Sequence, residues 1–116
     1  MKIDKVWGYE IWVVNSTKYC GKRLILNKGW RCSLHYHKVK DETFLIASGK
    51  VLMEVNGGVF VMNPGDSIRV KPLTHHRFGG LEDSEIIEFS THHEENDSYR
   101  VELSGRMPDG LHQNAT

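Results

Sequence analysis

Residues 32–37 read Cys-Ser-Leu-His-Tyr-His, and this alternating stretch is typical of a β-strand. Side chains on a β-strand point alternately to its two faces, so Ser33, His35 and His37 share one face. Glu42 follows five residues after the second histidine and opens the next apolar run. A turn between the two strands would return its carboxylate to the same face. We therefore expect two imidazoles and one carboxylate to gather at one place on a sheet.

A further imidazole comes from a distant part of the chain. Residues 73–77 read Leu-Thr-His-His-Arg and supply His75 and His76. Two histidines at i and i+2, a carboxylate and a remote histidine form a mixed nitrogen and oxygen set that suits a divalent first-row metal. The residues alone leave open which of the two adjacent histidines completes the set.

The chain around these residues has an all-β pattern. Short β-prone runs alternate with turn signals every 8 to 12 residues, and no window sustains a helical period. Asn56-Gly57 predicts a tight hairpin turn, because both residues tolerate positive φ. So many short strands with no room for helical crossovers predict an antiparallel double-sheet jelly roll or small β-barrel. The expected strands are 10–14, 22–26, 32–37, 43–47, 50–55, 59–62, 67–70, 75–78 and 85–90, with a possible edge strand at 98–103.

Length and composition limit the remaining possibilities. The 116 residues predict one domain over residues 1–104, followed by a flexible tail over 105–116. Lys plus Arg and Asp plus Glu are both 15, so no basic field favours nucleic acid as a partner. No apolar run is long enough to cross a membrane, and we expect a cytoplasmic protein. The two cysteines, Cys20 and Cys32, lack metal or redox spacing and are expected to be reduced thiols.

The histidines and the glutamate that could bind a metal lie in a sequence pattern that resembles the cupin superfamily. The first cupin motif, G-x5-H-x-H-x4-E-x6-G, is met at every position, by Gly29, His35, His37, Glu42 and Gly49. This resemblance implies that the two histidines and the glutamate bind a metal.

The second cupin motif, G-x5-P-x-G-x2-H-x3-N, is met in part. Gly65 and His76 fall in place, whereas Lys71, Leu73 and Gly80 stand where the motif has proline, glycine and asparagine. The motif spacing favours His76 over its neighbour as the fourth ligand. The implied metal is a divalent Zn, Mn, Fe, Ni or Co ion, among which the ligand set does not choose.

The resemblance extends to the phosphomannose-isomerase-like cupins of sugar metabolism. Residues 5–10 look like that branch's opening basic-x-Trp-Gly, His76-Arg77 like its His-Arg pair, and Ile87-Glu88 like its last barrel strand. The branch implies that Glu88 points into the barrel and moves protons, although an exposed strand glutamate is an equal alternative. Because Arg77 follows the metal-type histidine, we expect that Arg77, with Lys71, could stabilise an enediolate or hold a phosphate.

These expectations lead to three hypotheses. The first is a metal-dependent isomerase or epimerase that acts on a sugar or sugar phosphate, in which the metal polarises a carbonyl. The second is an Fe(II) dioxygenase, and the third is a non-catalytic module that binds a small molecule through its metal. We also expect a homodimer, since small cupins commonly pair through an outer sheet and Leu34 and Tyr36 would face outward.

Two other groups of residues are given weaker roles. His92 and His93 are adjacent, so their imidazoles should point apart and form a poor second metal site. The three tryptophans could stack on a sugar, but in a chain this small aromatic rings more often fill the core. These are Trp7, Trp12 and Trp30.

Overall fold

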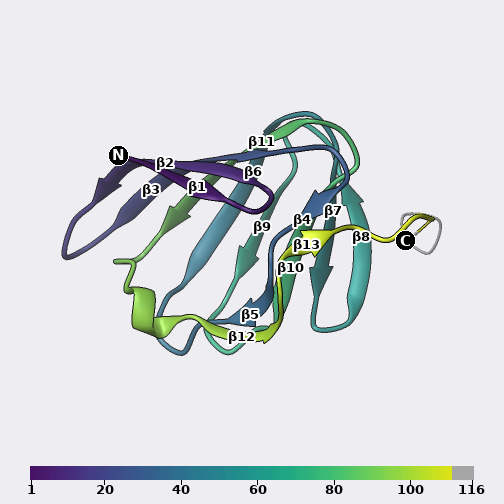
Figure 1. Ribbon diagram of the computed structural model, residues 1–116. Helices are drawn as coiled ribbons and strands as arrows, with labels where there is room; N and C mark the ends of the chain where they lie inside the picture. The colour runs from purple at the N-terminus through teal and green to yellow at the C-terminus, as the bar shows by residue number, and fades with distance from the viewer. Residues whose placement is uncertain (111–116) are drawn as a thin grey trace.

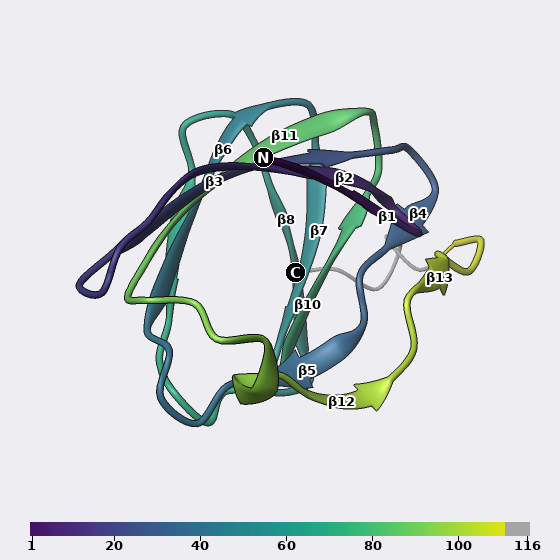
Figure 2. The same ribbon diagram turned by 60° about the vertical axis from the view of Figure 1, so that its left-hand side comes forward.

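The structure is a computed structural model that describes residues 1–110, and it consists of two antiparallel sheets that face each other (Figures 1 and 2). The first sheet has six strands in the order β1-β2-β3-β11-β6-β9. Their bounds are Lys2–Lys5, Gly8–Asn15, Cys20–Leu26, Ser84–Ser90, Glu42–Ser48 and Ser67–Val70. This confirms the predicted jelly roll of two sheets.

The second sheet has seven strands and is built around β10 (His76–Gly80). One edge of β10 pairs with β7, and the other edge pairs with β5 and β4. Beyond these lie β8, which pairs with β7, and β12 and β13, which pair with β5 and β4. The bounds of β4, β5, β7, β8, β12 and β13 are Trp30–Arg31, Leu34–Tyr36, Val51–Val55, Gly58–Met62, Tyr99–Glu102 and Gly105–Arg106.

The inner faces of the two sheets differ along their length. One part is an apolar core, in which Trp7 packs edge-on against Phe78 with ring centroids 5.2 Å apart. Each fully buried leucine, isoleucine or phenylalanine here contributes roughly 1.5–3 kcal/mol. The other part of the six-stranded sheet buries charged side chains on the same face. The largest fully buried apolar residues are Phe44, Leu24, Leu26, Ile46, Met53 and Ile86, and the buried charged residues of the sheet are Lys22, Glu42 and Glu88.

Two turns follow the sequence signals. Asn56 and Gly57 have φ values of 48° and 84°, which confirms the predicted hairpin turn between β7 and β8. Gly49, the last glycine of the first motif, has φ 86°, and a Cβ there would collide with Ser84. Only glycine fits this turn without strain.

Leu73 shows why the second motif has glycine at its position. Its φ is 70°, in the left-handed region that disfavours side chains with a Cβ. The backbone N–H of Leu73 donates to the carbonyl of His37 over 2.6 Å, so the turn is tied to the strand that carries the histidines. The chain keeps this turn despite the unfavourable residue.

Every predicted strand is present, with ends shifted by a few residues. The prediction missed β1, the two-residue β4 and the two-residue β13, the last of which lies inside the predicted tail. Gly105 and Arg106 pair with β4, and Met107 N–H donates to the carbonyl of Gly29 over 2.7 Å. The start of the predicted tail is therefore part of a sheet, and residues 111–116 lie outside the described residues.

Other expectations fare differently. Cys20 and Cys32 are free thiols, as predicted, and both are buried. Burial raises the pKa of Cys32 to about 12.

Tyr36 stacks on Tyr99 of β12 with ring centroids 5.2 Å apart, so a strand of the same chain lies beside it. The homodimer stays a prediction, which gel filtration tests. Within residues 1–110, no helix is long and apolar enough to span a membrane.

Candidate metal centre

Three histidines converge between the two sheets. His35 lies on β5 and is the direct cross-strand partner of His76 on β10, while His37 follows one residue after β5 ends. One potential ligand atom from each lies within 4.8 Å of the other two. Alternation along β5 and pairing between β5 and β10 thus produce the cluster, as the spacing of the first two histidines predicted.

Backbone carbonyls fix the orientation of all three rings. Nδ1 of His35, His37 and His76 lies 2.7, 2.9 and 2.9 Å from a carbonyl oxygen of Ser33, Asp97 and Thr74, respectively. A carbonyl oxygen only accepts, so each Nδ1 carries the hydrogen and donates it. The neutral imidazole then has its lone pair on Nε2. This is the tautomer that a metal ligand needs, held by the kind of outer contact that metal-binding histidines make.

Glu42 brings a carboxylate to the same point from the opposite sheet. Its Oε2 lies 3.2 Å from His37 Nε2 and 3.0 Å from His76 Nε2. Burial raises the pKa of Glu42, whereas the Lys40 charge 3.5 Å from Oε1 lowers it, and the net pKa is well below the usual value. The carboxylate is therefore the charged form, as a metal ligand requires.

The donor set fits a divalent metal. Glu42 Oε2 and His76 Nε2 are fully buried and have no hydrogen-bond partner among residues 1–110. Burying such atoms unpaired is costly, and lone pairs that face one another repel. A cation bound by these atoms would satisfy them. Burial and the neighbouring His76 lower the pKa of His35 to about 3, so this ring is neutral at ordinary pH.

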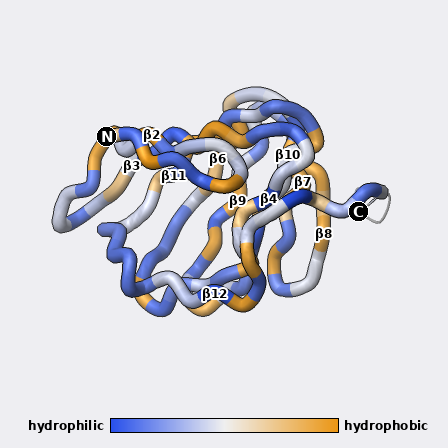
Figure 3. The backbone as a smooth tube through the Cα atoms, viewed as in Figure 1, coloured by the Kyte–Doolittle hydropathy of each residue, from blue (hydrophilic) through white to orange (hydrophobic). Residues whose placement is uncertain are grey.

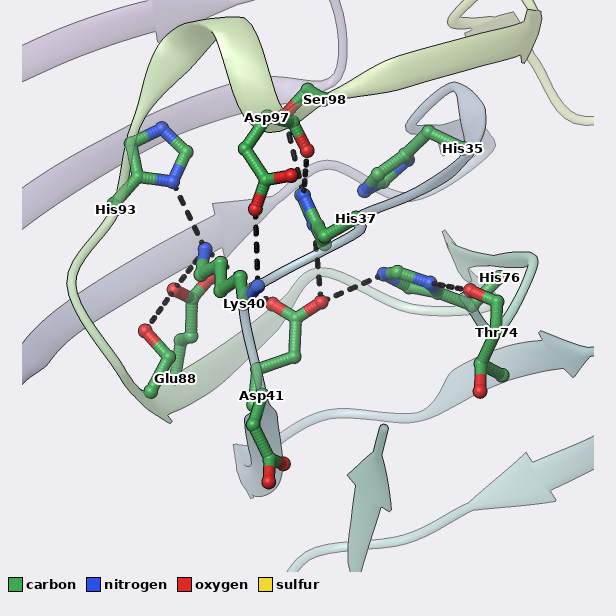
Figure 4. A network of polar contacts seen from close by, with 12 residues as sticks. His35, His37, Lys40, Asp41, Thr74, His76, Glu88, His93, Asp97 and Ser98 are labelled. Carbon is green, nitrogen blue, oxygen red and sulfur yellow. Dashed lines mark hydrogen bonds and ion pairs between the residues drawn. The ribbon is translucent and has the colours of Figure 1, made fainter. Parts of the chain in front are cut away.

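A buried lysine joins the histidine cluster to a second carboxylate (Figure 4). Lys40 Nζ lies 3.5 Å from Glu42 Oε1, 2.7 Å from Glu88 Oε2 and 3.1 Å from His93 Nδ1. Burial lowers the pKa of Lys40, but the two carboxylates raise it more, so the net shift is upward. One ammonium group thus holds both carboxylates at the cluster.

Glu88 is buried and faces the site. Its Oε2 accepts hydrogen bonds from Lys40 and, over 3.0 Å, from Ser90 Oγ. Its Oε1 makes no hydrogen bond within the described part of the chain. This rules out the alternative of an exposed strand glutamate, and it leaves one carboxylate oxygen available to a ligand.

One cavity of about 90 Å³ is lined by His35, His37, Glu42, Lys40 and Glu88. Lys5, Glu10 and Lys22 line the same cavity, and Lys22 on β3 is the cross-strand partner of Glu88 on β11, which lies between β3 and β6. The largely hydrophilic segment between β11 and β12, coloured mostly blue in Figure 3, contributes His93 and Glu95 to its wall. Asp97 fastens this segment, because its carboxylate accepts the backbone N–H groups of residues 38–40.

Comparisons with known proteins agree with this architecture. Residues 22–92 match the family described as the cupin domain. The chain belongs to the cupin family. A D-lyxose/D-mannose isomerase from Thermosediminibacter oceani is 30% identical to this cupin over 125 aligned positions, which cover 83% of this chain and 69% of the isomerase.

Solved structures share the cupin fold at lower identity. KdgF from Halomonas sp. superposes with a TM-score of 0.71 and 20% identity, covering 76% of this chain and 81% of that one. The nucleoside dehydratase Pac13 from Streptomyces superposes with a TM-score of 0.78 and 15% identity, covering 89% of this chain and 85% of Pac13. At these identities the likeness shows the fold, and cupins of one fold carry different activities.

The structure brings together all four residues predicted as cupin metal ligands, namely His35, His37, Glu42 and His76. His76 is fully buried in the cluster, whereas His75 is exposed and its ring lies 4.6 Å from the Tyr36 ring. The neighbouring histidine is therefore not part of the cluster.

Arg77 does not reach this site. Its guanidinium donates to the carbonyls of Cys32 and Leu103 and to the carboxylate of Glu102, and it does not line the cavity. Because Arg77 follows His76 on one strand, it points to the opposite face. Lys71 is exposed and does not line the cavity either. The expected roles in holding a phosphate or an enediolate therefore lack structural support.

Several site residues were missed. The sequence did indicate that Lys22 is unusual. It alternates with Cys20 and Leu24 on the inward face of a strand, where apolar residues are expected. Lys40 lies in a turn without periodicity, so nothing in the sequence marked it. His93 points inward and His92 outward, as adjacent residues should, and the inward one contacts Lys40 rather than a metal-type cluster.

Proposed function

We propose that this cupin is a metal-dependent isomerase or epimerase that acts on a sugar or sugar phosphate. The observation that carries the proposal is the position of Glu88, whose unused carboxylate oxygen faces the same cavity as the histidine cluster. The relative of 30% identity named D-lyxose/D-mannose isomerase supports the same class of reaction.

In this proposal, His35, His37, Glu42 and His76 hold a divalent Zn, Mn, Fe, Ni or Co ion. When bound, such an ion polarises a carbonyl oxygen and makes the neighbouring C–H bond more acidic. The Nδ1 bonds to backbone carbonyls keep the three Nε2 atoms directed at one point before the ion arrives. The site is thus organised in advance, which lowers the entropic cost of binding.

Glu88 is the proposed acid–base group. Its Oε1 accepts the proton from the carbon beside the carbonyl and returns it to the former carbonyl carbon for isomerisation, while the proton of the neighbouring hydroxyl passes to the carbonyl oxygen. For epimerisation, a second group would supply a proton to the other face of the intermediate. Lys40 and Ser90 hold Oε2, so the carboxylate keeps one orientation during both transfers. The segment between β11 and β12 contributes His93, Glu95 and Ser98 to the wall of the cavity.

The proposal is tested with metal-free protein reloaded separately with each of the five metals. Each form is incubated in D2O with D-lyxose, D-mannose or D-mannose 6-phosphate, and NMR follows the products. We expect conversion to the ketose or epimer, with deuterium at the carbon that exchanges its proton. The matched control is protein that stays metal-free.

The same experiment separates the other hypotheses. No conversion by any metal form contradicts the isomerase and epimerase proposal. Iron-dependent oxygen consumption would instead indicate a dioxygenase, since isomerisation consumes no oxygen. Ligand-induced thermal stabilisation without turnover would indicate a binding module.

A further inference from the structure

A row of polar side chains crosses the inner face of the six-stranded sheet, away from the histidine cluster. Trp12 on β2 pairs with Lys22 on β3, which in turn pairs with Glu88 on β11. Cross-strand partners point to the same face, so all three side chains face inward. Glu10 lies two residues before Trp12 on that face. The row therefore leads from the proposed acid–base group to the far end of the cavity.

Lys22 is the unusual member of this row. Its side chain is 2% exposed and lines the cavity, yet its ammonium donates no hydrogen bond within residues 1–110. The nearest carboxylate oxygen, Glu10 Oε1, is 3.7 Å away, which is beyond hydrogen-bond length. The Trp12 ring lies 4.2 Å from Nζ and stabilises its charge without accepting a conventional hydrogen bond. A ligand in the cavity can accept hydrogen bonds from these unused donors in place of water.

Glu10 supplies acceptors beside these donors. Its Oε1 accepts the indole N–H of Trp12 over 2.9 Å, and its Oε2 lies 3.9 Å from Lys5 Nζ. A carboxylate oxygen accepts more than one hydrogen bond, so Glu10 has acceptor sites to spare. Ammonium donors and carboxylate acceptors side by side match a hydroxyl group, which both accepts and donates.

The charges at this end balance, which argues against a phosphate. Lys5 and Lys22 face the carboxylates of Glu10 and Glu95. Burial opposes ionisation of Glu95, but its bond to His93 and the charges of both lysines hold its pKa below the usual value. A dianionic phosphate would therefore meet two carboxylates. Arg100 lines the cavity and has no carboxylate partner in the described chain, but it pairs with His35 and so belongs to the opposite end.

We propose that Lys22 and Glu10 form a specificity subsite that binds the distal hydroxyl groups of an unphosphorylated sugar whose carbonyl end lies at the histidine cluster. Two strand spacings, roughly 10 Å, separate β3 from β6, so only the far end of a sugar held at the cluster reaches Lys22. The inference rests on the proposed function for the direction of the sugar, and it narrows the substrate from sugars and sugar phosphates to neutral sugars.

The test uses Lys22→Met in the metal-loaded full chain, because methionine fills the space without donors and Glu10 keeps Trp12 and Lys5 as partners. NMR-monitored titrations measure the dissociation constants of D-mannose, its 4-deoxy and 6-deoxy analogues, and D-mannose 6-phosphate. We expect the substitution to weaken D-mannose binding about tenfold, as loss of a charge-assisted hydrogen bond does. For the analogue that lacks the contacted hydroxyl, wild-type protein and Lys22→Met should differ in dissociation constant by less than about twofold.

Two controls accompany this variant. Lys50→Met removes an exposed lysine that does not line this cavity and should leave every dissociation constant unchanged. Glu10→Gln keeps the shape of the side chain, tests the acceptor half of the subsite, and serves if Lys22→Met does not fold. It should weaken D-mannose binding with the same dependence on the distal hydroxyls.

The results separate the subsite from the reaction. Equal losses for all four ligands, no loss for D-mannose, or tighter Lys22-dependent binding of the phosphate would each overturn the subsite. Wild-type protein that binds D-mannose through Lys22 but converts no sugar would overturn the reaction and leave the subsite standing. If wild-type protein converts D-mannose while Lys22→Met binds it with an unchanged dissociation constant, the subsite would be overturned and the reaction would stand.

Discussion

The converging histidines and the adjacent pair at 92 and 93 use their ring nitrogens differently. In His35, His37 and His76, Nδ1 donates to a backbone carbonyl and Nε2 is left facing the shared space. In His92, Nδ1 bonds the carbonyl of Ser16 and Nε2 contacts Glu94, while His93 contacts Lys40 and Glu95 through its two nitrogens. A histidine with both nitrogens occupied by protein has no atom left for a metal. The state of the second nitrogen, rather than the number of histidines, marks the candidate centre.

The largest expected difference between the two groups is in metal affinity. His76→Gln should weaken binding of Zn²⁺ by more than about 100-fold, since one of four ligands is lost from a site with a large total binding free energy. His92→Gln should leave the affinity unchanged. Competition titration with a chromogenic chelator measures both, and circular dichroism checks that both variants fold. Equal affinities for the two variants would remove the distinction between the groups.

Between the two groups lies Glu88, which Lys40 links to both. Glu88→Gln should lower kcat for sugar conversion by about 100-fold, the lower range for loss of a positioned acid–base group. Metal content should stay the same, because Glu88 is not one of the converging ligands. Glu85→Gln is the matched control, since Glu85 is on the same strand but pairs with Arg23 on the surface. An unchanged kcat in Glu88→Gln would show that the proton moves through another group.

The two groups of histidines should also differ in how their contribution to the free energy of unfolding changes with pH. Burial lowers the pKa of His35 to about 3, so its neutral form stabilises the metal-free protein above pH 6.5 and this stability is lost on acidification. The slope is at most about 1.4 kcal/mol per pH unit below pH 6.5. The bonds to Ser16 and Glu94 raise the pKa of His92, so its contribution is present at low pH and lost as pH rises.

Urea unfolding of metal-free protein between pH 5 and pH 8 checks this prediction. His35→Gln should flatten the loss of stability on the acid side, whereas His92→Gln should cost more stability at low pH than at high pH. Changes of the same sign in both variants would contradict the assignment of the two environments.

The smallest expected effect concerns the turn that delivers His76. Leu73 is 63% exposed and has φ 70°, so glycine there should relieve backbone strain. Leu73→Gly should stabilise the protein by up to about 1 kcal/mol, less the extra entropy of glycine in the unfolded chain. Thermal unfolding measures this change. Leu103→Gly, at another exposed leucine, should not stabilise.

The period of a strand explains which parts of the site were predictable. His35, His37 and Glu42 were found because alternation and a short turn bring them together, and the motif spacing distinguished His76 from its neighbour. The expectation for Arg77 rested on its place directly after His76, whereas alternation along a strand places the two side chains on opposite faces. Lys40 lies in a turn and His93 in a polar segment, where no period indicates which way a side chain points. Their places depend on Asp97, whose long-range contacts no local pattern reveals.

We expect one metal ion to bind at the converging histidines. X-ray absorption at the zinc edge of protein loaded with one equivalent of Zn²⁺ measures the ligands directly. The spectrum should show one ion per chain, with scattering from three histidine nitrogens and at least one carboxylate oxygen. Fewer than two histidine nitrogens, or the same spectrum from His76→Gln, would contradict it.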